Sequence, residues 1–279
     1  MKFGCHVSIR KGYLGAAKQA AALNAAAYQF FPKNPRSLTI KNYDPTEAKL
    51  CKEYCCEHQL TSVAHTPYPT SLTPSSEKRE ITISSLLNDL EIANACGSEG
   101  VVVHFGKKVH RNDPLADYQL MISMLNSVLS QWKGDCKILL ENNAGKPGSI
   151  GTTFEELVQV RKLCDYPEKI GFCLDTCHAF ASGLWTGDNW LEVLENGQKL
   201  GYFEHLKVIH LNNSMYKIRE GKDRHTNIFN NGYIRENQFE ELVLSPVLID
   251  IPFILETPSK SGITHEEEIQ QLNLKWGSH

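Results

Sequence analysis

The segment that decides the fold is KIGFCLDTCHAF, residues 169–180. Its first half is an apolar run with the length of a buried strand, and it ends at Asp175, with His178 three residues further on. Neither an aspartate nor a histidine is stable in a protein core without a partner. The segment therefore predicts a strand that leaves the core and places two polar side chains at or just beyond its carboxyl end.

Seven other runs of apolar, β-branched or aromatic residues resemble this strand, and helix-like stretches separate them. Strands that alternate with helices form parallel sheets covered on both faces. Eight such units in a chain of 279 residues predict an α/β fold, a (β/α)8 TIM barrel that forms a single domain over 1–279. An open doubly wound sheet is the alternative. The eight predicted strands are 2–7, 27–31, 61–65, 100–105, 137–142, 170–175, 207–212 and 252–257.

The composition is that of a soluble globular protein, with 41% hydrophobic and 22% charged residues. No segment is apolar for long enough to cross a bilayer, and the first residues do not resemble a secretion signal. Nine scattered cysteines, an odd number, indicate reduced thiols rather than a disulfide framework. We therefore expect a cytoplasmic protein without a membrane partner, and a monomer. The net charge of −3 does not by itself indicate a nucleic-acid partner.

Most of the predicted strands end on residues that can bind metal ions. The carboxyl ends of parallel barrel strands open on one face, where TIM-barrel enzymes carry their chemistry. His178 follows Asp175 by three residues, and the DRH run at 223–225 lies in the loop after the predicted strand at 207–212. We therefore expect nine side chains to converge at one mouth: His65, His104, Glu141, Asp175, His178, His210, Asp223, His225 and Glu256.

Five imidazoles and four carboxylates suit zinc or manganese, and nine ligands divide into three open sites of about three ligands each. Adjacent divalent ions stabilise the attacking and leaving oxygens of a displacement at phosphorus. Three such ions against four carboxylates leave a local charge of about +2, which attracts a phosphodiester. Each residue alone has a simpler interpretation: Asp175 could cap a helix that starts at Thr176, and Glu256 could form an ion pair. The nine together favour metal binding.

The motifs that carry these residues resemble endonuclease IV, a family of metal-dependent apurinic/apyrimidinic endonucleases of base-excision repair. The resemblance runs through GCHVSIRKG, FFPKNPRS, VAHTPY, VVHFG, LLENNAG with GTTFEEL, CLDTCHAFASG, HLNNS, DRHTNI and ILETP. CLDTCHAFASG and DRHTNI are highly specific, whereas VVHFG alone would be weak evidence.

The resemblance implies three zinc ions, with manganese as an alternative at one site. By this resemblance His65, His104 and Glu141 hold the first ion; Glu141 bridges to a second, held by Asp175, His210 and Glu256; and His178, Asp223 and His225 hold the third. The implied reaction is hydrolysis of the phosphodiester 5′ to an abasic site in duplex DNA by a metal-activated hydroxide, which leaves a 3′-hydroxyl and a 5′-deoxyribose phosphate. Glu141 or Glu256 orients or deprotonates the attacking water, and the sequence does not choose between them.

Three further residues are expected to contact DNA on the same basis. Arg36 in KNPRS and Tyr68 in HTPY match residues that enter the duplex in the family, and Lys33 is expected to contact a phosphate. Without the resemblance, all three would be read as ordinary surface or loop residues.

The chain departs from the family pattern at several positions near these motifs. Most are single replacements, and FNNG carries one extra residue after DRHTNI. No departure removes an expected ligand, but each puts contacts around the ligands or with DNA in doubt. The replaced positions are Phe105, Lys146, Pro147, Leu184, Asn213 and Met215.

Two other functions remain open from the sequence. A TIM-barrel sugar isomerase or epimerase would use one or two divalent ions, and it would leave His178, Asp223 and His225 without a role. A non-catalytic module that binds abasic DNA would keep the metals but lack productive geometry.

Overall fold

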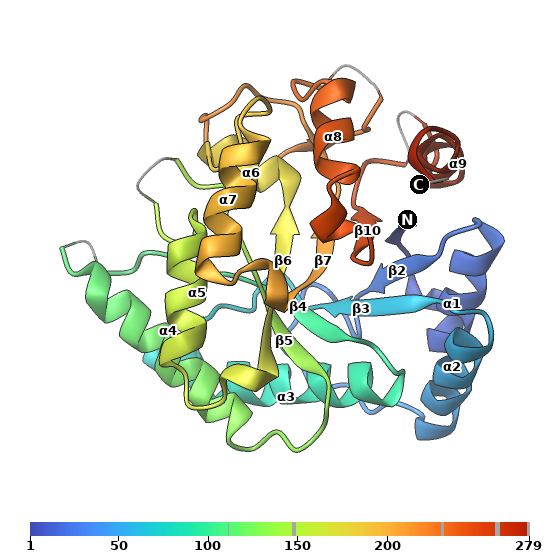
Figure 1. The fold of residues 1–279 in the computed structure, drawn as a ribbon. Coiled ribbons are helices and arrows are strands. Elements are labelled where there is room, and N and C mark those ends of the chain that lie inside the picture. Colours follow the sequence, from blue (N-terminus) through green and yellow to red (C-terminus); the bar gives the residue numbers. More distant parts are fainter. Residues whose placement is uncertain (111, 147–148, 230–231, 260–262, 278–279) are drawn as a thin grey trace.

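The computed structural model describes residues 1–110, 112–146, 149–229, 232–259 and 263–277. Eight parallel strands close into a barrel in the order β1-β10-β7-β6-β5-β4-β3-β2 (Figure 1). The predicted TIM barrel is confirmed, and every predicted strand overlaps an observed one. The strands are β1 (Lys2–His6), β2 (Ala27–Phe30), β3 (Thr61–His65), β4 (Gly100–His104), β5 (Lys137–Glu141), β6 (Ile170–Asp175), β7 (Leu206–His210) and β10 (Pro252–Leu255).

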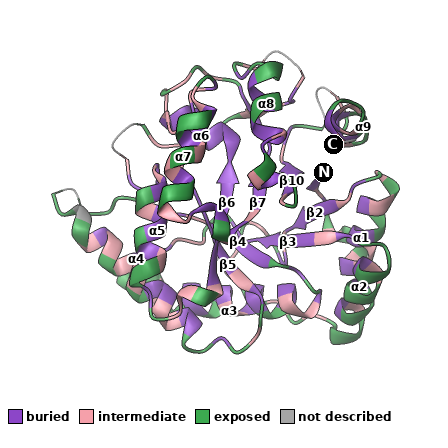
Figure 2. Cartoon of the chain, viewed as in Figure 1, coloured by how far each residue is buried: buried purple, intermediate pink, exposed green. Residues whose placement is uncertain are grey.

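Helices surround the barrel, with exposed outer sides over buried strands (Figure 2). The helix α9 and the short antiparallel pair β8 (Asn213–Ser214) and β9 (His225–Thr226) were not predicted from the sequence, and α6 was raised only as a helix that Asp175 could cap. No helix in the described part of the chain is long and apolar enough to span a membrane. The helices are α1 (Gly12–Ala22), α2 (Pro45–Glu57), α3 (Arg79–Ala95), α4 (Pro114–Leu129), α5 (Phe154–Leu163), α6 (Thr176–Ser182), α7 (Trp190–Leu200), α8 (Glu236–Val243) and α9 (His265–Trp276).

The barrel interior is filled by side chains and is not a channel. Seven strands each contribute one buried apolar residue to an inner cluster: Ala27, Val63, Val102, Leu139, Cys173, Val208 and Ile254. The eighth strand, β1, places Gly4 between Ala27 and Ile254. A Cβ at Gly4 would lie 1.6 Å from the carbonyl oxygen of Ala27, so only glycine fits this position. This packed interior supports the strand ends at which the polar residues lie.

Candidate metal centre

Asp175 ends β6, and its two carboxylate oxygens make different contacts. Oδ1 accepts a hydrogen bond from the backbone N–H of His178 at 2.7 Å and so caps α6. Oδ2 lies 3.6 Å from Nε2 of His225 and 3.9 Å from Nδ1 of His210. The cap that the sequence suggested as a simpler interpretation is therefore present, and it leaves the second oxygen facing the other polar residues.

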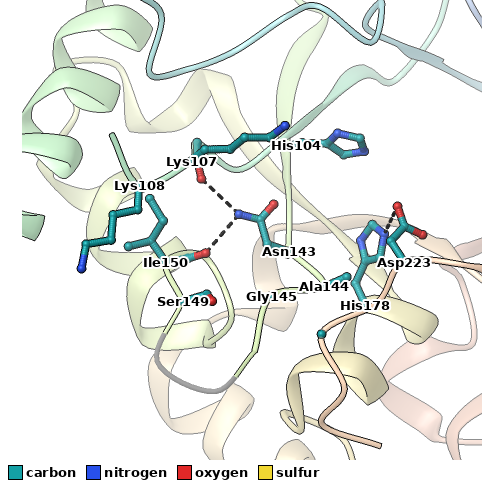
Figure 3. A pocket seen from close by; sticks show the side chains of 12 residues that line it. His104, Lys107, Lys108, Asn143, Ala144, Gly145, Ser149, Ile150, His178 and Asp223 are labelled. Atoms are coloured by element: carbon teal, nitrogen blue, oxygen red, sulfur yellow. Dashed lines mark hydrogen bonds and ion pairs between the residues drawn. The ribbon is translucent and has the colours of Figure 1, made fainter. Parts of the chain in front are cut away.

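His178, in the first turn of α6, belongs to a group with Asp223 and His225. Its Nδ1 donates to the carbonyl oxygen of Asn142 at 2.8 Å, which leaves the lone pair on Nε2. That Nε2 lies 3.4 Å from Oδ2 of Asp223 (Figure 3), and Nε2 of His225 lies 3.1 Å from Oδ1 of the same carboxylate. One ligand atom from each of the three residues lies within 4.8 Å of the others, close enough to share one ion.

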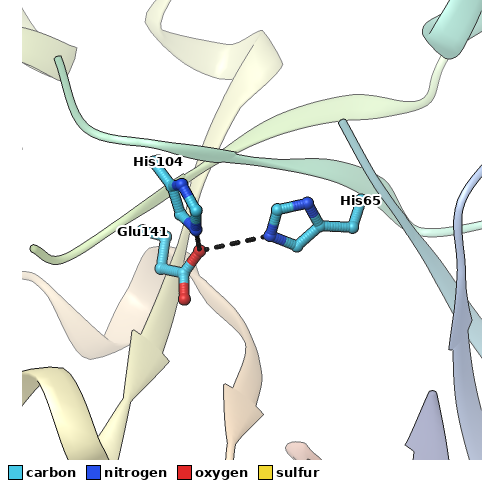
Figure 4. Close-up of side chains that lie close together, drawn as sticks. All are labelled: His65, His104 and Glu141. Carbon is cyan, nitrogen blue, oxygen red and sulfur yellow. Dashed lines mark ion pairs between the residues drawn. The ribbon is translucent and has the colours of Figure 1, made fainter. Parts of the chain in front are cut away.

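A second group joins the ends of β3, β4 and β5. Nε2 of His65 and Nε2 of His104 approach Oε2 of Glu141 at 3.5 and 3.3 Å (Figure 4). Nδ1 of His65 donates to the carbonyl oxygen of Thr66 at 2.8 Å, so that its Nε2 keeps a free lone pair. One ligand atom from each of these three residues also lies within 4.8 Å of the others.

Glu141 connects this group to a third one, at β6, β7 and β10. Its other oxygen, Oε1, lies 3.0 Å from Nδ1 of His210, and Oε2 of Glu256 lies 3.3 Å from the same nitrogen. Ligand atoms within 4.8 Å of one another also come from the four residues of this group, which are Glu141, Asp175, His210 and Glu256. The structure thus brings all nine predicted residues together in three adjacent groups, with Glu141 shared by two of them.

Three buried atoms of these groups have no hydrogen-bond partner: Oε2 of Glu141, Nε2 of His178 and Nε2 of His225. Buried polar atoms without a partner are rare and costly in native proteins. All three atoms are typical metal ligands and point at other ligands, so a cation among them would satisfy them. The donor set and these orphaned atoms therefore fit divalent metal binding.

The electrostatics of the centre lower the pKa of three of its carboxylates, whereas burial outweighs the nearby imidazoles and raises the pKa of Asp175. Burial alone would raise the pKa of Glu141, but the imidazoles of His210 and His104 hold it well below the usual range. In the same way, the adjacent imidazoles of His178 and His225 outweigh burial and lower the pKa of Asp223. Burial lowers the pKa of His104 to about 4, which keeps this imidazole neutral at physiological pH. Ionised carboxylates and a neutral imidazole are the forms that bind metal ions.

Two amide side chains that sequence reasoning missed orient the ligands. Gln29, in β2, donates to Oε1 of Glu256 at 2.6 Å, and its Oε1 accepts from Nε2 of His210 at 2.8 Å. Asn212 donates to Oδ2 of Asp175 at 2.7 Å and accepts from the backbone N–H of Glu256 at 2.9 Å. Gln29 fixes the His210 tautomer so that Nδ1 faces the carboxylates. A polar residue inside the apolar run AYQF was the available signal for Gln29.

Asn213 does not contact any of the nine residues directly. Its Nδ2 donates to the carbonyl oxygens of Ile228 and Ile234 at 3.0 and 2.9 Å, and its Oδ1 accepts from the backbone N–H groups of Ser214 and Ile234. Asn213 therefore holds the loop that follows His225 on β9.

The remaining departures lie around the ligands rather than among them. Phe105 and Leu184 pack into or against the core, while Met215 and Lys146 are exposed. Pro147, and the residues 230–231 within FNNG, lie outside the described residues. The described departures thus leave all three groups of ligands intact.

Arg36 and Tyr68 lie on adjacent loops beside the mouth. The backbone N–H of Tyr68 donates to the carbonyl oxygen of Pro35 at 2.8 Å, which joins the two loops. Tyr68 is 65% exposed, and its ring contacts the edge of Phe31 at a centroid distance of 5.3 Å. Arg36 is exposed as well. Both side chains are free to reach a large ligand at the mouth.

The prediction that Lys33 contacts phosphate is wrong for this structure, because Lys33 is buried. Its Nζ lies 3.0 Å from Oδ1 of Asp89 and donates to the carbonyl oxygen of Ser85 at 2.7 Å. The side chain is only 1% exposed. Lys33 therefore ties the loop after β2 to α3 and does not face a ligand.

A cavity of about 540 Å³ opens over the nine residues at the carboxyl end of the barrel. Six of the nine residues line it, and Phe31, Tyr68 and Arg224 form part of its rim; the six are His65, His104, His178, Asp223, His225 and Glu256. Glu141 does not line the cavity and is fully buried, whereas the Glu256 side chain is 20% exposed. Of the two carboxylates predicted to handle water, Glu256 is the one that a ligand in the cavity can reach.

The chain matches known proteins over nearly its whole length. Residues 17–277 match a family described as "Xylose isomerase-like TIM barrel". The chain is 40% identical over 270 residues to a protein named "Probable endonuclease 4" from Symbiobacterium thermophilum, covering 96% of this chain and 97% of the relative. A second protein of that name, from Halothermothrix orenii, is 36% identical over 278 residues, or 98% and 99% of the two chains.

Solved structures also match the chain over nearly its whole length. The crystal structure of endonuclease IV from Thermus thermophilus matches with a TM-score of 0.84 and 32% identity, over 98% of this chain and 97% of that chain. A D-tagatose 3-epimerase-like protein, at 21% identity and a TM-score of 0.69 over 98% and 95% of the chains, shares the fold alone. The chain therefore belongs to the endonuclease IV family of xylose isomerase-like TIM barrels and is an enzyme of the hydrolase class.

Proposed function

We propose that this enzyme is a metal-dependent endonuclease of DNA repair that hydrolyses the phosphodiester 5′ to abasic sites in duplex DNA. The products would be a 3′-hydroxyl and a 5′-deoxyribose phosphate. The observation that carries the proposal is the convergence of nine imidazoles and carboxylates in three adjacent groups, two of which share Glu141. The family to which the chain belongs and the exposed loops with Arg36 and Tyr68 support DNA as the substrate.

The residues fit three divalent ions, for which we propose zinc, with manganese as an alternative at one site. Bound there, the ions would lower the pKa of a water molecule and stabilise the charge on the leaving oxygen. His65, His104 and Glu141 would hold one ion, Glu141, Asp175, His210 and Glu256 a second, and His178, Asp223 and His225 the third. This assignment gives each of the three groups at least three ligands.

The side chains around the cavity have separate tasks in this mechanism. Burial would raise the pKa of Glu256, but His210 and other imidazoles lower it to about 2, so that its Oε2 is an ionised acceptor at the cavity wall. Glu256 would orient the attacking water through this oxygen, and Gln29 holds its other oxygen in place. Glu141, which is fully buried, would serve as a bridging ligand rather than as a base.

The substrate has to leave the DNA stack before it can enter the cavity. An abasic nucleotide is extruded at the lowest cost because its base is already missing. The aromatic side chains of Phe31 and Tyr68 line the cavity beside His65 and His6, and they offer a surface for the exposed sugar. Arg36, next to Tyr68 in space, would contact the duplex from which the nucleotide is extruded.

The substrate for the test is a duplex that carries one tetrahydrofuran abasic analogue. We expect the zinc-loaded protein to cut this duplex on the 5′ side of the analogue. Prolonged chelation should abolish cleavage, and added zinc should restore it, because the bound ions would supply the positive charge that stabilises the leaving oxygen. Gel analysis of end-labelled strands, with an intact duplex as the control, measures both. Protein shown to hold three metal ions that binds this duplex but does not cut it would be the non-catalytic binding module instead.

Metal stoichiometry tests the isomerase alternative. Members of the same fold with sugar-epimerase names show that the barrel supports other chemistry. One or two exchangeable ions per chain, together with isomerisation of a free sugar, would favour that alternative. The group His178, Asp223 and His225 argues against it, because a third site has no task in such a reaction.

We expect Tyr68→Ala to weaken binding of the abasic duplex by about tenfold, since one aromatic contact to a nucleotide contributes about 1–3 kcal/mol. Zinc content should stay at the wild-type level, because Tyr68 contacts Phe31 but none of the proposed ligands. Tyr166→Ala is the matched control, since Tyr166 precedes β6 and so lies at the opposite end of the barrel. Fluorescence anisotropy and metal analysis measure the two effects, and loss of zinc in Tyr68→Ala would contradict this placement.

A further inference from the structure

A second cavity, of about 560 Å³, lies beside the centre between the loops that follow β4 and β5 (Figure 3). It shares His104, His178 and Asp223 with the cavity over the proposed ligands, so the two hollows adjoin at these residues. Asp223 is the one acidic residue that lines it within the described part of the chain, and it is itself a proposed ligand. Two lysines, Lys107 and Lys108, complete its charged lining. The proposed function assigns no role to this side of the centre.

The loop that carries the two lysines is held in place from both sides. Thr73 Oγ1 lies 2.9 Å from the carbonyl oxygen of Lys107 and 3.0 Å from its backbone nitrogen. The buried carboxylate of Asp117 accepts from the backbone N–H groups of Val109 and His110 and lies 2.7 Å from Nδ1 of His110. The lysine side chains themselves are exposed and form no ion pair with a described residue. A fixed backbone thus presents two uncommitted cations.

The two lysines point in different directions. Figure 3 shows the side chain of Lys107 extending toward His104, whereas that of Lys108 extends away from it. Lys107 therefore directs its ammonium group toward His104, a residue that both cavities share. Cations in such a position bind phosphate oxygens through charge-assisted hydrogen bonds.

We propose that Lys107 binds a phosphodiester of the substrate strand next to the scissile one, and that the strand leaves the centre through this second cavity. The inference rests on the proposed function, since it needs a DNA strand whose scissile phosphate lies at the nine residues. A strand anchored there has a phosphate on each side of the cut, and this cavity opens directly from the centre. Lys107 is then a substrate-binding residue that fixes the path of the strand, and Lys108 is not.

Lys107→Ala and Lys108→Ala form a matched pair, because both remove one exposed charge from the same loop. Lys107→Ala should raise the KM for abasic duplex by about tenfold with little change in kcat. It should also reduce the slope of log K against log salt for binding by about 0.9, the value for one lost phosphate contact. Lys108→Ala should change KM by less than about twofold. Thermal unfolding and zinc content of both variants should match the wild type.

Duplexes with a neutral methylphosphonate at single positions on either side of the scissile bond identify the phosphate. At one adjacent position the substitution should weaken wild-type binding and have no further effect on Lys107→Ala, because the contact is already gone. Two results would overturn the role of Lys107 if the wild type still discriminates abasic from intact duplex. One is an equal rise in KM for the two lysine variants; the other is that the effects of Lys107→Ala and of the methylphosphonate add at every position. Wild-type protein that fails to discriminate the two duplexes would instead overturn the proposed function and this inference with it.

Discussion

Glu141→Gln should abolish cleavage of the abasic duplex, with kcat/KM lower by more than about a thousandfold, or ~4 kcal/mol of transition-state stabilisation. Glu141 is the one residue shared between two of the three groups of ligands, with Oε2 facing His65 and His104 and Oε1 facing His210. Glutamine has the same shape but carries no charge and offers only one acceptor atom. It cannot bridge two cations, so we expect metal content to fall in both groups that contain Glu141.

The barrel should stay folded in this variant, because the change is isosteric and the packed interior does not involve Glu141. Glu220→Gln is a suitable control: it is the same chemical change on a residue near the mouth that forms an exposed ion pair with Lys222. Metal analysis, circular dichroism and end-labelled cleavage separate the possibilities. Wild-type turnover by Glu141→Gln would rule out the bridging role, and an unfolded protein would show that the carboxylate is needed for the fold.

The strands and the convergence of the nine side chains could be predicted because both follow from strong local signals. Each strand is an apolar run bounded by polar residues, and each of the nine residues lies at the end of such a run or in the loop that follows it. Parallel connectivity then requires these ends to meet on one face. The grouping of the ligands by ion, however, came from the family resemblance, since spacing in the sequence does not show which strand ends are neighbours.

What could not be predicted depends on contacts between distant parts of the chain. All seven residues of α6 are buried, so this helix has no amphipathic pattern that would reveal it. Gln29 and Asn212 are single polar residues within or beside apolar runs, and their role appears only when the carboxyl ends of β2, β7 and β10 meet at one mouth. Lys33 was expected to contact a phosphate because of the family resemblance, and the sequence does not show that its partner is Asp89, which lies on a distant helix.

The burial of Lys33 leads to the second large effect that we expect, on stability. Lys33→Met should lower the free energy of unfolding by about 3–5 kcal/mol, because it leaves the buried carboxylate of Asp89 without its cation. Lys49→Met provides the control, since Lys49 forms an exposed pair with Glu53 at 3.7 Å that should contribute about 0.5 kcal/mol or less. Urea denaturation followed by circular dichroism measures both.

The double variant Lys33→Met/Asp89→Leu should recover most of this loss. Burial raises the pKa of Asp89 to about 7 and lowers the pKa of Lys33, and the attraction between the two groups offsets only part of either shift. A buried pair with this balance is often replaced by apolar residues at little cost. A double variant as unstable as Lys33→Met would show instead that the ion pair itself stabilises the fold.

The pH dependence of the single variant follows from the same carboxylate. Without Lys33, the pKa of Asp89 in the folded protein should rise further above its unfolded value, so the folded state binds a proton that the unfolded state has released. Stability is then greatest when Asp89 is protonated and falls as pH rises through the folded pKa. The deficit of Lys33→Met relative to wild type should therefore grow between about pH 6 and pH 8. In the double variant the stability deficit should not change over this range. The slope of log K against log salt for DNA binding should also equal that of the wild type, because Lys33 is buried and contacts no phosphate. Loss of one phosphate contact would reduce that slope by about 0.9.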